Sequence, residues 1–144
     1  MKKIPEHGWC FVCGTANPHS MGLTWWVNDQ GILSSEFTLN EAHQGPPGNA
    51  HGGASAAILD EAMGLVVWVA GHKVAAVNIE INYYKPVPLH QKLALEARIS
   101  QTDERKIYSS GEIHLPDGSV AVSGRGIYVT APQLFEKVQL YKQE

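Results

Sequence analysis

Two acidic residues, Asp60 and Glu61, stand inside a long apolar segment, and their position is what first suggests chemistry. The segment runs from about Gly52 to Val69 and contains no other charged residue. An isolated carboxylate in apolar surroundings is strongly disfavoured, so each of these groups must pair, face water or take part in a reaction. A surface stripe or a salt bridge is the competing interpretation, because structural ion pairs also perturb carboxylates.

The start of the same segment is rich in glycine and follows the helix-breaking sequence QGPPGN at 44–49. The N-terminus of a helix presents unpaired N–H groups and a partial positive charge, which suit the negative oxygen that forms when a carbonyl is attacked. Gly52 would let a carbonyl approach these donors closely. Asn49, acting as an N-cap, could instead occupy one of them.

Gly52 and Asp60 are too far apart to serve one carbonyl within a single chain. They are eight residues apart, and a helix rises ~1.5 Å per residue, which separates them by roughly 12 Å along its axis. If both act on one carbonyl, two copies of the helix must lie antiparallel about a two-fold axis, each supplying what the other lacks. This requirement predicts an isologous homodimer with two equivalent sites, and a homotetramer built from two such dimers satisfies it equally.

The elements that position these residues follow from hydrophobic periodicity. Segment 52–69 is apolar on every side, as expected of a buried helix, and Gly71 is a suitable stop signal. The turns at 29–31 and 116–118 predict hairpins. The sequence is therefore expected to give an α+β fold, with a curved, mostly antiparallel six-stranded sheet wrapped around one long central helix. The expected strands are 23–28, 32–39, 73–84, 92–100, 106–115 and 119–130.

Length and composition favour one domain covering residues 1–144, with a loop region at 1–22 and a tail at 131–144 that could form a short helix. The net charge of −3 and the scattered lysines and arginines argue against a nucleic-acid partner. The longest uninterrupted apolar run, 65–70, is far too short to span a membrane, and no secretory signal pattern is recognisable. We therefore expect no membrane partner and a cytoplasmic location.

The two cysteines, Cys10 and Cys13, form a C-x-x-C motif. In a reducing compartment such a motif suggests redox chemistry or a metal site, but no βαβ pattern surrounds it. His7 and His19 could complete a set of four zinc ligands, although their spacing matches no common site. A packed pair of small thiols is the favoured interpretation, and we expect neither a metal nor a cofactor.

Several motifs together resemble a known family. His51-Gly52-Gly53 is followed by Asp60 nine positions after the histidine, and the chain also contains HQGPPG at 43–48, NYYKPVP at 82–88 and CFVCGTANPHSMGL at 10–23. From about residue 10 to residue 130 the sequence is similar to the hotdog-fold acyl-CoA thioesterases, in particular to their PaaI-like branch. The resemblance implies that a sheet wraps around one helix and that the substrate is the thioester of CoA or a related carrier.

The resemblance also implies roles for the residues of the motif. The backbone N–H of Gly52, beside Gly53, would polarise the thioester carbonyl. Asp60 of the partner chain would activate a water as general base, or attack directly as a nucleophile. His51 is expected to support the entry into the helix rather than to act as a base.

Two positions depart from the pattern of the relatives. Some relatives carry Asn or Gln where this chain has Gly45, and Gln44 could reach in its place. Relatives also often carry Ser or Thr where this chain has Ala76. Asn78, two residues further along the strand, is expected on the same face and could substitute.

Other residues are candidates for contacts with the substrate. Lys85 and Arg125 could bind the CoA phosphates. Apolar walls for the acyl group could come from Trp25, Trp26, Met63 and Trp68, although for each taken singly an ordinary core position is the favoured interpretation. Two other functions remain open. The first is a non-catalytic acyl-CoA binding module. The second is an enoyl-CoA hydratase or dehydratase on the same scaffold, in which His51 or His43 would need a larger role in the reaction.

Overall fold

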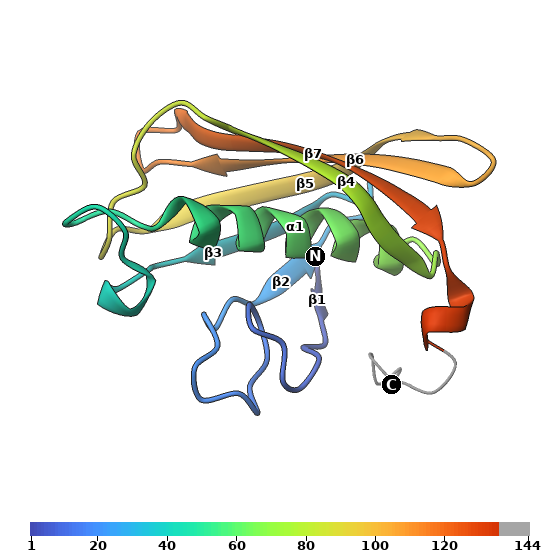
Figure 1. Ribbon diagram of the computed structural model, residues 1–144, viewed down its shortest axis with the longest axis horizontal. Coiled ribbons are helices and arrows are strands. Elements are labelled where there is room, and N and C mark those ends of the chain that lie inside the picture. The colour runs from blue at the N-terminus through green and yellow to red at the C-terminus, as the bar shows by residue number, and fades with distance from the viewer. Residues whose placement is uncertain (136–144) are drawn as a thin grey trace.

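A single long helix lies against the concave face of a curved antiparallel sheet (Figure 1). The computed structural model describes residues 1–135. The helix is α1 (Gly52–Val69), and two short 3-10 helices are η1 (Glu41–His43) and η2 (Pro132–Phe135). The seven strands are β1 (Lys2–Ile4), β2 (Trp25–Val27), β3 (Leu33–Phe37), β4 (Val74–Tyr83), β5 (Leu93–Thr102), β6 (Lys106–His114) and β7 (Val120–Thr130).

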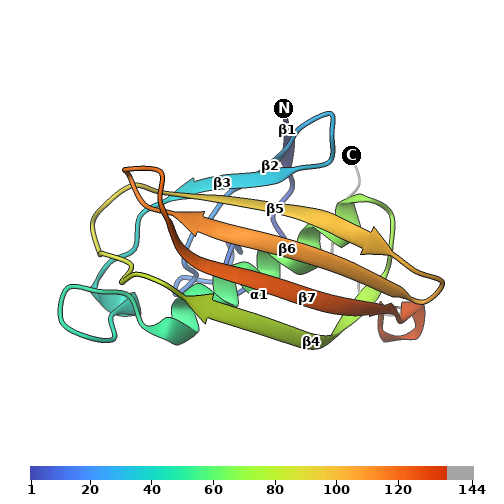
Figure 2. The same cartoon turned by 90° about the horizontal axis from the view of Figure 1, so that it is seen from above.

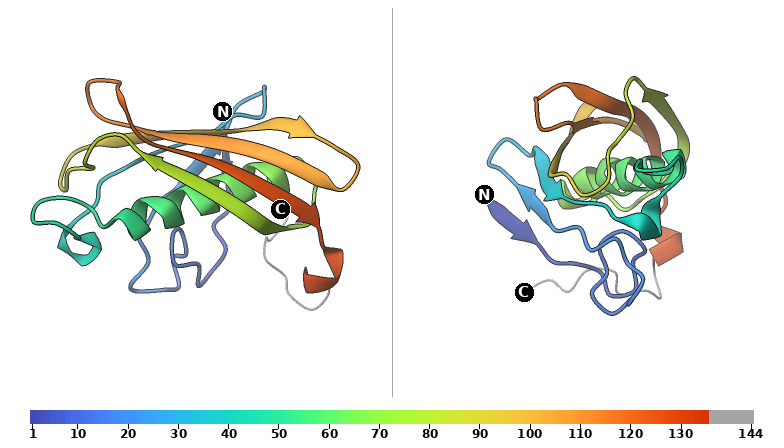
Figure 3. Two further views of the ribbon diagram at one scale, coloured as in Figure 1. Left: turned by 45° about the horizontal axis from the view of Figure 1, so that its top comes forward. Right: turned by 90° about the vertical axis from the view of Figure 1, so that its left-hand side faces the viewer.

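The strands lie side by side in the order β1-β2-β3-β5-β6-β7-β4, and every neighbouring pair is antiparallel (Figure 2). Viewed from its end, the sheet curls around α1 (Figure 3). This arrangement confirms the predicted hotdog fold. The helix has the predicted bounds, and the turns at 29–31 and 116–118 contain glycines with positive φ, Gly31 at 77° and Gly118 at 87°.

The strand count was predicted as six, and the seventh strand is β1, which lies in the region expected to be loop. Ile4 pairs with Trp25 and Lys2 with Val27 at the edge of the sheet. Three residues are too few to show a period-2 pattern, and two of them are lysines, so the strand is defined by its partner rather than by its own sequence. At the other end of the chain, η2 matches the start of the expected tail helix, and residues 136–144 lie outside the described part.

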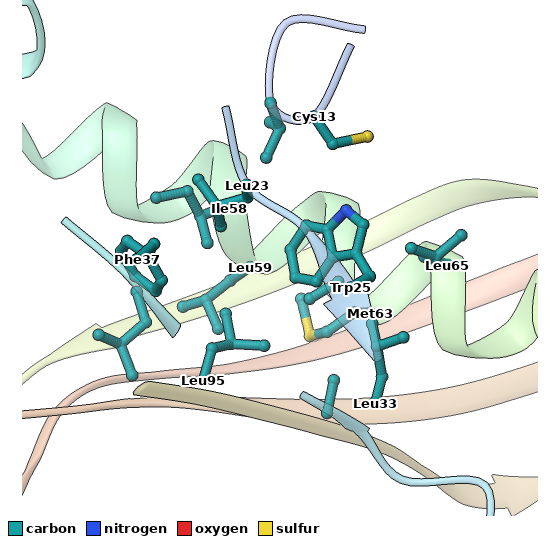
Figure 4. Packing of buried hydrophobic residues seen from close by; sticks show 14 of the residues in the cluster. Cys13, Leu23, Trp25, Leu33, Phe37, Ile58, Leu59, Met63, Leu65 and Leu95 are labelled. Atoms are coloured by element: carbon teal, nitrogen blue, oxygen red, sulfur yellow. The ribbon is translucent and has the colours of Figure 1, made fainter. Parts of the chain in front are cut away.

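The core lies between α1 and the sheet (Figure 4). Ile58, Leu59 and Met63 of α1 are fully buried, as is Leu95 of β5. Burying such a side chain stabilises the fold by about 1.5–3 kcal/mol, which explains the apolar composition of the helix. Trp25 is also buried, in the same hydrophobic cluster as Met63, so these two are core residues and not walls of an open site.

Strand β4 forms one edge of the sheet, and its regular alternation is interrupted. Ala76 pairs with Tyr128 and Asn78 with the adjacent Ile127, so Val77 is inserted as a β-bulge. Cross-strand partners point to the same face, and neighbouring residues of β7 point to opposite faces. The expectation that Asn78 shares the face of Ala76 is therefore wrong, because the extra residue turns Asn78 to the side away from α1.

Candidate active site

The first turn of α1 is held by the side chain of His51. His51 is the N-cap, with extended backbone angles (φ −61°, ψ 138°), and its Nδ1 accepts a hydrogen bond from the N–H of Gly53 at 2.8 Å. A Cβ added to Gly53 would lie 3.0 Å from this same nitrogen, so glycine keeps the cap unobstructed. His51 therefore supports the helix entry, as expected. Asn49, the other candidate N-cap, bonds through its side chain to Pro47 O.

Gly52 supplies a backbone N–H donor that the His51 cap does not bind. Within residues 1–135 the Gly52 N–H has no hydrogen-bond acceptor, while its carbonyl accepts a bond from the hydroxyl of Tyr83 at 2.7 Å. A Cβ on Gly52 would lie 3.3 Å from that hydroxyl oxygen, which is tighter than ordinary packing. Tyr83, the last residue of β4, thus holds the peptide between Gly52 and Gly53. The preceding peptide, which carries the free N–H, is held through His51 O, which accepts a bond from Ala54 N at 2.9 Å. Sequence analysis did not identify this role of Tyr83.

The loop before α1 is compact and leaves no space for a side chain at position 45. A Cβ on Gly45 would approach His51 Cα to 2.7 Å. The side chain of Gln44, proposed to reach the carbonyl, instead accepts a hydrogen bond from Gly48 N at 3.0 Å. In this protomer Gln44 shapes the loop rather than extending toward Gly52.

Asp60 lies in the middle of α1, on the wall of a cavity of about 240 Å³ that also contacts Trp68, Ala76 and Tyr128. The carboxylate remains accessible to solvent, but the surrounding groups displace part of its water. This desolvation raises its pKa above the ordinary value of 3.8, and a hydrogen bond with Tyr128 partly offsets the increase. A carboxyl group in such a cleft has the properties of a general base or nucleophile.

Tyr128 of β7 was not identified from the sequence. Only 2% of it is exposed, and its hydroxyl lies 3.4 Å from the backbone carbonyl oxygen of Asp60. Burial raises the pKa of this hydroxyl, so it stays protonated and can only donate toward the neighbouring acid. The residue is therefore placed to hold the helix turn and the carboxylate of Asp60 in position.

The other acidic residue, Glu61, is paired, and its role differs from that of Asp60. Its Oε1 lies 3.0 Å from His7 Nε2 and 3.7 Å from Cys13 Sγ, and burial raises its pKa. Hydrogen bonds with Cys10 and Glu61 raise the pKa of His7 to about 10. The N-terminal loop is thus attached to α1 one residue away from Asp60, and His7 and Glu61 form part of the cavity wall.

The remaining candidate residues lie at several different places in the structure. Arg125 is on the outer face of the sheet, where it pairs with Glu80 at 3.2 Å, and the structure does not bring it to the cavity of Asp60. Asn78 faces the same outer side. Lys85 is exposed and follows β4 two residues after Tyr83, so it lies at the Gly52 end of the molecule. Trp68 is on the cavity wall, while Trp26 is a surface residue.

Comparison with known proteins gives a family match over the part of the chain that carries the site. A family model described as the thioesterase superfamily matches residues 47–122. Acyl-coenzyme A thioesterase THEM5 of Homo sapiens is 25% identical over 100 residues, which are 69% of this chain and 38% of that protein. The chain spans about two fifths of the length of the curated relatives it matches.

Solved structures agree with the fold. A thioesterase superfamily protein, RHA08564, superposes with a TM-score of 0.82 at 32% identity, over 84% of this chain and 60% of that one. A thioesterase protein from Streptococcus pneumoniae, crystallised with coenzyme A, gives 0.71 at 19% identity, covering 76% and 85%. The PaaI protein of E. coli gives 0.70 at 17% identity, covering 76% and 83%. The last two show similarity of fold alone.

Proposed function

Because the chain belongs to the thioesterase superfamily, we propose that it hydrolyses the thioester of an acyl-CoA or of a related carrier. The observation that carries the proposal is the free N–H of Gly52 at the start of α1, beside a Gly53 N–H that is already capped by His51. One donor fixed by its surroundings, at the positive end of a helix, is the arrangement that stabilises the oxyanion of acyl transfer.

The acid of the reaction is Asp60, and it is supplied by a second chain. Within one protomer the axial separation of roughly 12 Å keeps Asp60 away from the carbonyl bound at Gly52. In an isologous dimer with antiparallel α1 helices, the Asp60 of each subunit meets the Gly52 of the other, which gives two equivalent sites. The catalytic unit proposed here is therefore a homodimer.

Strand β4 supports this assembly. It is an edge strand, so one row of its backbone N–H and C=O groups has no strand partner within the described chain. Apolar side chains on β4 are unusually exposed: Val77 at 56%, Ile79 at 38% and Tyr83 at 54%. A second copy of β4 running antiparallel would cover them and continue the sheet. The same contact sets the two α1 helices antiparallel.

Hydrolysis then proceeds without a cofactor. The carbonyl oxygen accepts the hydrogen bond of Gly52, and Asp60 of the partner subunit removes a proton from a water that attacks the carbonyl carbon. The tetrahedral intermediate collapses as the carbon–sulfur bond breaks, and Asp60 returns the proton to the leaving thiolate. Direct attack by Asp60 would give a mixed anhydride that water hydrolyses in a second step. The two routes give the same products.

CoA is the proposed carrier because the curated relatives carry the name acyl-coenzyme A thioesterase. The Streptococcus pneumoniae structure with coenzyme A has the same fold. Lys85 is the proposed phosphate contact, because it is exposed at the Gly52 end of the chain. A cavity of about 240 Å³ next to Asp60, with Trp68 on its wall, is the proposed entrance for the acyl or aryl group.

The test is thiol release from short, medium, long and aromatic acyl-CoAs, with Asp60→Asn as the inactive form. We expect release from at least one class and a loss of roughly 10²–10⁴-fold in kcat for the variant, the usual contribution of a general base. Asp29→Asn, in the exposed turn between β2 and β3, is the matched control and keeps wild-type activity. No thiol release from any class, together with retained acyl-CoA binding, would identify a binding module instead.

A further inference from the structure

The N-terminal loop and α1 together present four side chains that can bind a metal. We propose that His7, Cys10, Cys13 and Glu61 bind one structural zinc ion, which fastens the N-terminal loop to the helix that carries Asp60. This inference does not depend on the proposed thioesterase activity. It replaces the expectation that the two cysteines are only a packed pair of thiols.

The four ligand atoms lie close enough together to surround one zinc ion. One ligand atom from each residue lies within 4.8 Å of all the others. Cys13 Sγ is 3.5 Å from His7 Nδ1 and 3.7 Å from Glu61 Oε1. With zinc bonds of ~2.0–2.3 Å, the edges of a tetrahedron measure roughly 3.3–3.8 Å. Only one ring nitrogen of His7 can bind the ion, so the 3.0 Å contact between His7 Nε2 and Glu61 Oε1 shows that the carboxylate lies beside the ring but is not an edge of the same tetrahedron as the Nδ1 contact.

The loop that carries the cysteines is built to hold them. Gly14 N donates to Cys10 O at 2.9 Å, and the N–H of Val12 points to Cys10 Sγ at 3.4 Å, a contact that favours the thiolate form. A Cβ on Gly14 would lie 2.2 Å from Gly8 O, so only glycine fits at this position. The cysteine turn is therefore fixed by the backbone before any metal binds.

The environment of the cluster also suits a metal ion. The side chains of His7 and Glu61 are only 14% and 21% exposed, and Cys13 is buried. A buried carboxylate needs a positive charge nearby, and the imidazole of His7 at 3.0 Å is the group beside Glu61 that can carry one in the absence of a metal. A divalent cation would replace the proton on His7 and balance the charges of the carboxylate and the thiolates together. Glu61 comes from the middle of α1, far along the chain from the loop, which explains why sequence spacing did not reveal it.

The donor set indicates zinc, and a structural role for it. Two thiolates and an imidazole form a soft set that prefers zinc to magnesium or calcium. Four protein ligands leave no open position for a substrate or a catalytic water, as in structural zinc sites. The ion would therefore hold residues 7–13 against α1. Asp60, which precedes Glu61, would not be a ligand, and the cavity wall around it would be held in place by the bound loop.

Metal content of the full chain tests the proposal. We expect protein expressed with added zinc, and purified without chelator, to contain about one zinc per chain when measured by inductively coupled plasma mass spectrometry. This is the stoichiometry of a closed four-ligand site. Cobalt in place of zinc is expected to give the strong visible absorption of tetrahedral coordination and a thiolate-to-metal charge-transfer band. Zinc-free protein that fails to bind added zinc or cobalt, or weak octahedral cobalt absorption, would overturn the proposal.

Ligand variants identify the donor set. Losing a group that merely orients a ligand already costs about 10- to 100-fold in metal affinity, so Cys10→Ser and Glu61→Gln are expected to weaken zinc binding by at least that much. His19→Ala is the matched control, because His19 is an exposed histidine of the same loop that sequence spacing offered as an alternative ligand. Loss of zinc in His19→Ala, or retention of full affinity in Glu61→Gln, would overturn the assignment of Glu61.

A stability readout covers the case in which a cysteine variant fails to fold. Chelation of the wild-type protein is expected to lower its Tm, and chelation of folded Glu61→Gln is expected to lower its Tm by less, because zinc binding to the native state adds to its stability in proportion to the affinity. A wild-type Tm that stays the same when the chelator has removed the zinc would contradict the proposal.

Discussion

The N–H of Gly53 donates to Nδ1 of His51 at 2.8 Å, and this bond divides the roles of the two glycines at the start of α1. Gly53 is committed to the cap. The preceding Gly52 keeps a free N–H, and the peptide that carries it is held through His51 O, which accepts a bond from Ala54 N at 2.9 Å. The helix thus begins with one donor already satisfied and one available to a substrate.

His51 is expected to affect stability more than chemistry. His51→Ala removes the acceptor of the cap and should lower the free energy of unfolding by about 1 kcal/mol, whereas His51→Asn, with a favourable capping side chain, should lose little. Both variants should change kcat by less than about ten-fold, below the usual effect of removing a general base. Urea unfolding and steady-state kinetics check this. A loss of kcat in both variants as large as that of Asp60→Asn would place His51 in the reaction.

Asp60 is expected to reduce the stability of the fold at neutral pH. Desolvation raises the pKa of Asp60 in the folded state above its ordinary value of 3.8. As the pH rises through the folded-state pKa, the folded protein must release a proton that it holds more tightly than the unfolded protein does. Stability associated with this group is therefore lost with rising pH. Asp60→Asn should have a higher Tm than wild type at pH 7, at equal protein concentration, with the difference shrinking toward pH 4.

Thermal unfolding of both proteins across this pH range makes the comparison. Asp29→Asn, on an exposed turn, should show no such difference. An Asp60→Asn protein that is less stable than wild type at pH 7 would contradict the assignment of a desolvated carboxylate.

Tyr128 is expected to set the pH at which Asp60 becomes active. Its hydrogen bond lowers the pKa of Asp60, so Tyr128→Phe should raise that pKa further and move the acidic limb of the kcat/KM profile to higher pH. The plateau at high pH should change little, because the base is ionised there in both proteins. Tyr108→Phe, on the outer face of β6, is the control. An unchanged limb would mean that Tyr128 serves packing alone.

The exposed face of β4 is expected to be the dimer interface. Ile79→Lys places a charge among the apolar side chains that a partner would cover, and it should convert the dimer to monomer with loss of activity. Gln101→Lys puts the same residue on an exposed position of β5 and should leave the mass unchanged. Light scattering after gel filtration measures the mass. A dimer that survives Ile79→Lys with full activity would exclude this face.

The family, the hotdog fold and the bounds of α1 could be predicted because they depend on patterns of many residues. Apart from Asp60 and Glu61 the helix is apolar on all sides, and Asp60 follows His51-Gly52-Gly53 at the spacing of the family motif. Five of the six predicted strands contain long alternating or β-branched runs, and their hairpin glycines have the positive φ that such turns require.

The details that were missed depend on single contacts between distant segments. The β-bulge at Val77 cannot be recognised from the pattern of polar and apolar residues in β4, and it turns Asn78 to the outer face of the sheet. Tyr128 meets Asp60, and His7 meets Glu61, only after the sheet and the N-terminal loop have packed against α1. The side chain of Gln44 accepts a hydrogen bond from the Gly48 N–H of its own loop, and this local contact could not be predicted from the sequence.

The account rests on two subunits completing each site, and a complementation assay tests it most directly. Gly52→Pro removes the N–H that would hold the carbonyl. Proline is favoured at the first helical position, and His51 already has the extended backbone that must precede proline. A Cβ at position 52 would lie 3.3 Å from the hydroxyl oxygen of Tyr83, and the three atoms nearest to it all belong to the phenol group of that side chain. Asp60→Asn removes the base, so each variant alone should be inactive.

The measurement is the rate of thiol release by dimers assembled from a mixture of these two variant chains. Sites shared between subunits predict recovery to roughly a quarter of wild-type activity, because half of the dimers are hybrids and each hybrid has one intact site. The double variant Gly52→Pro, Asp60→Asn, mixed with wild type, should form hybrids with no intact site. Hybrids of the single variants that stay inactive, while wild-type chains remain active beside the double variant, would contradict the account.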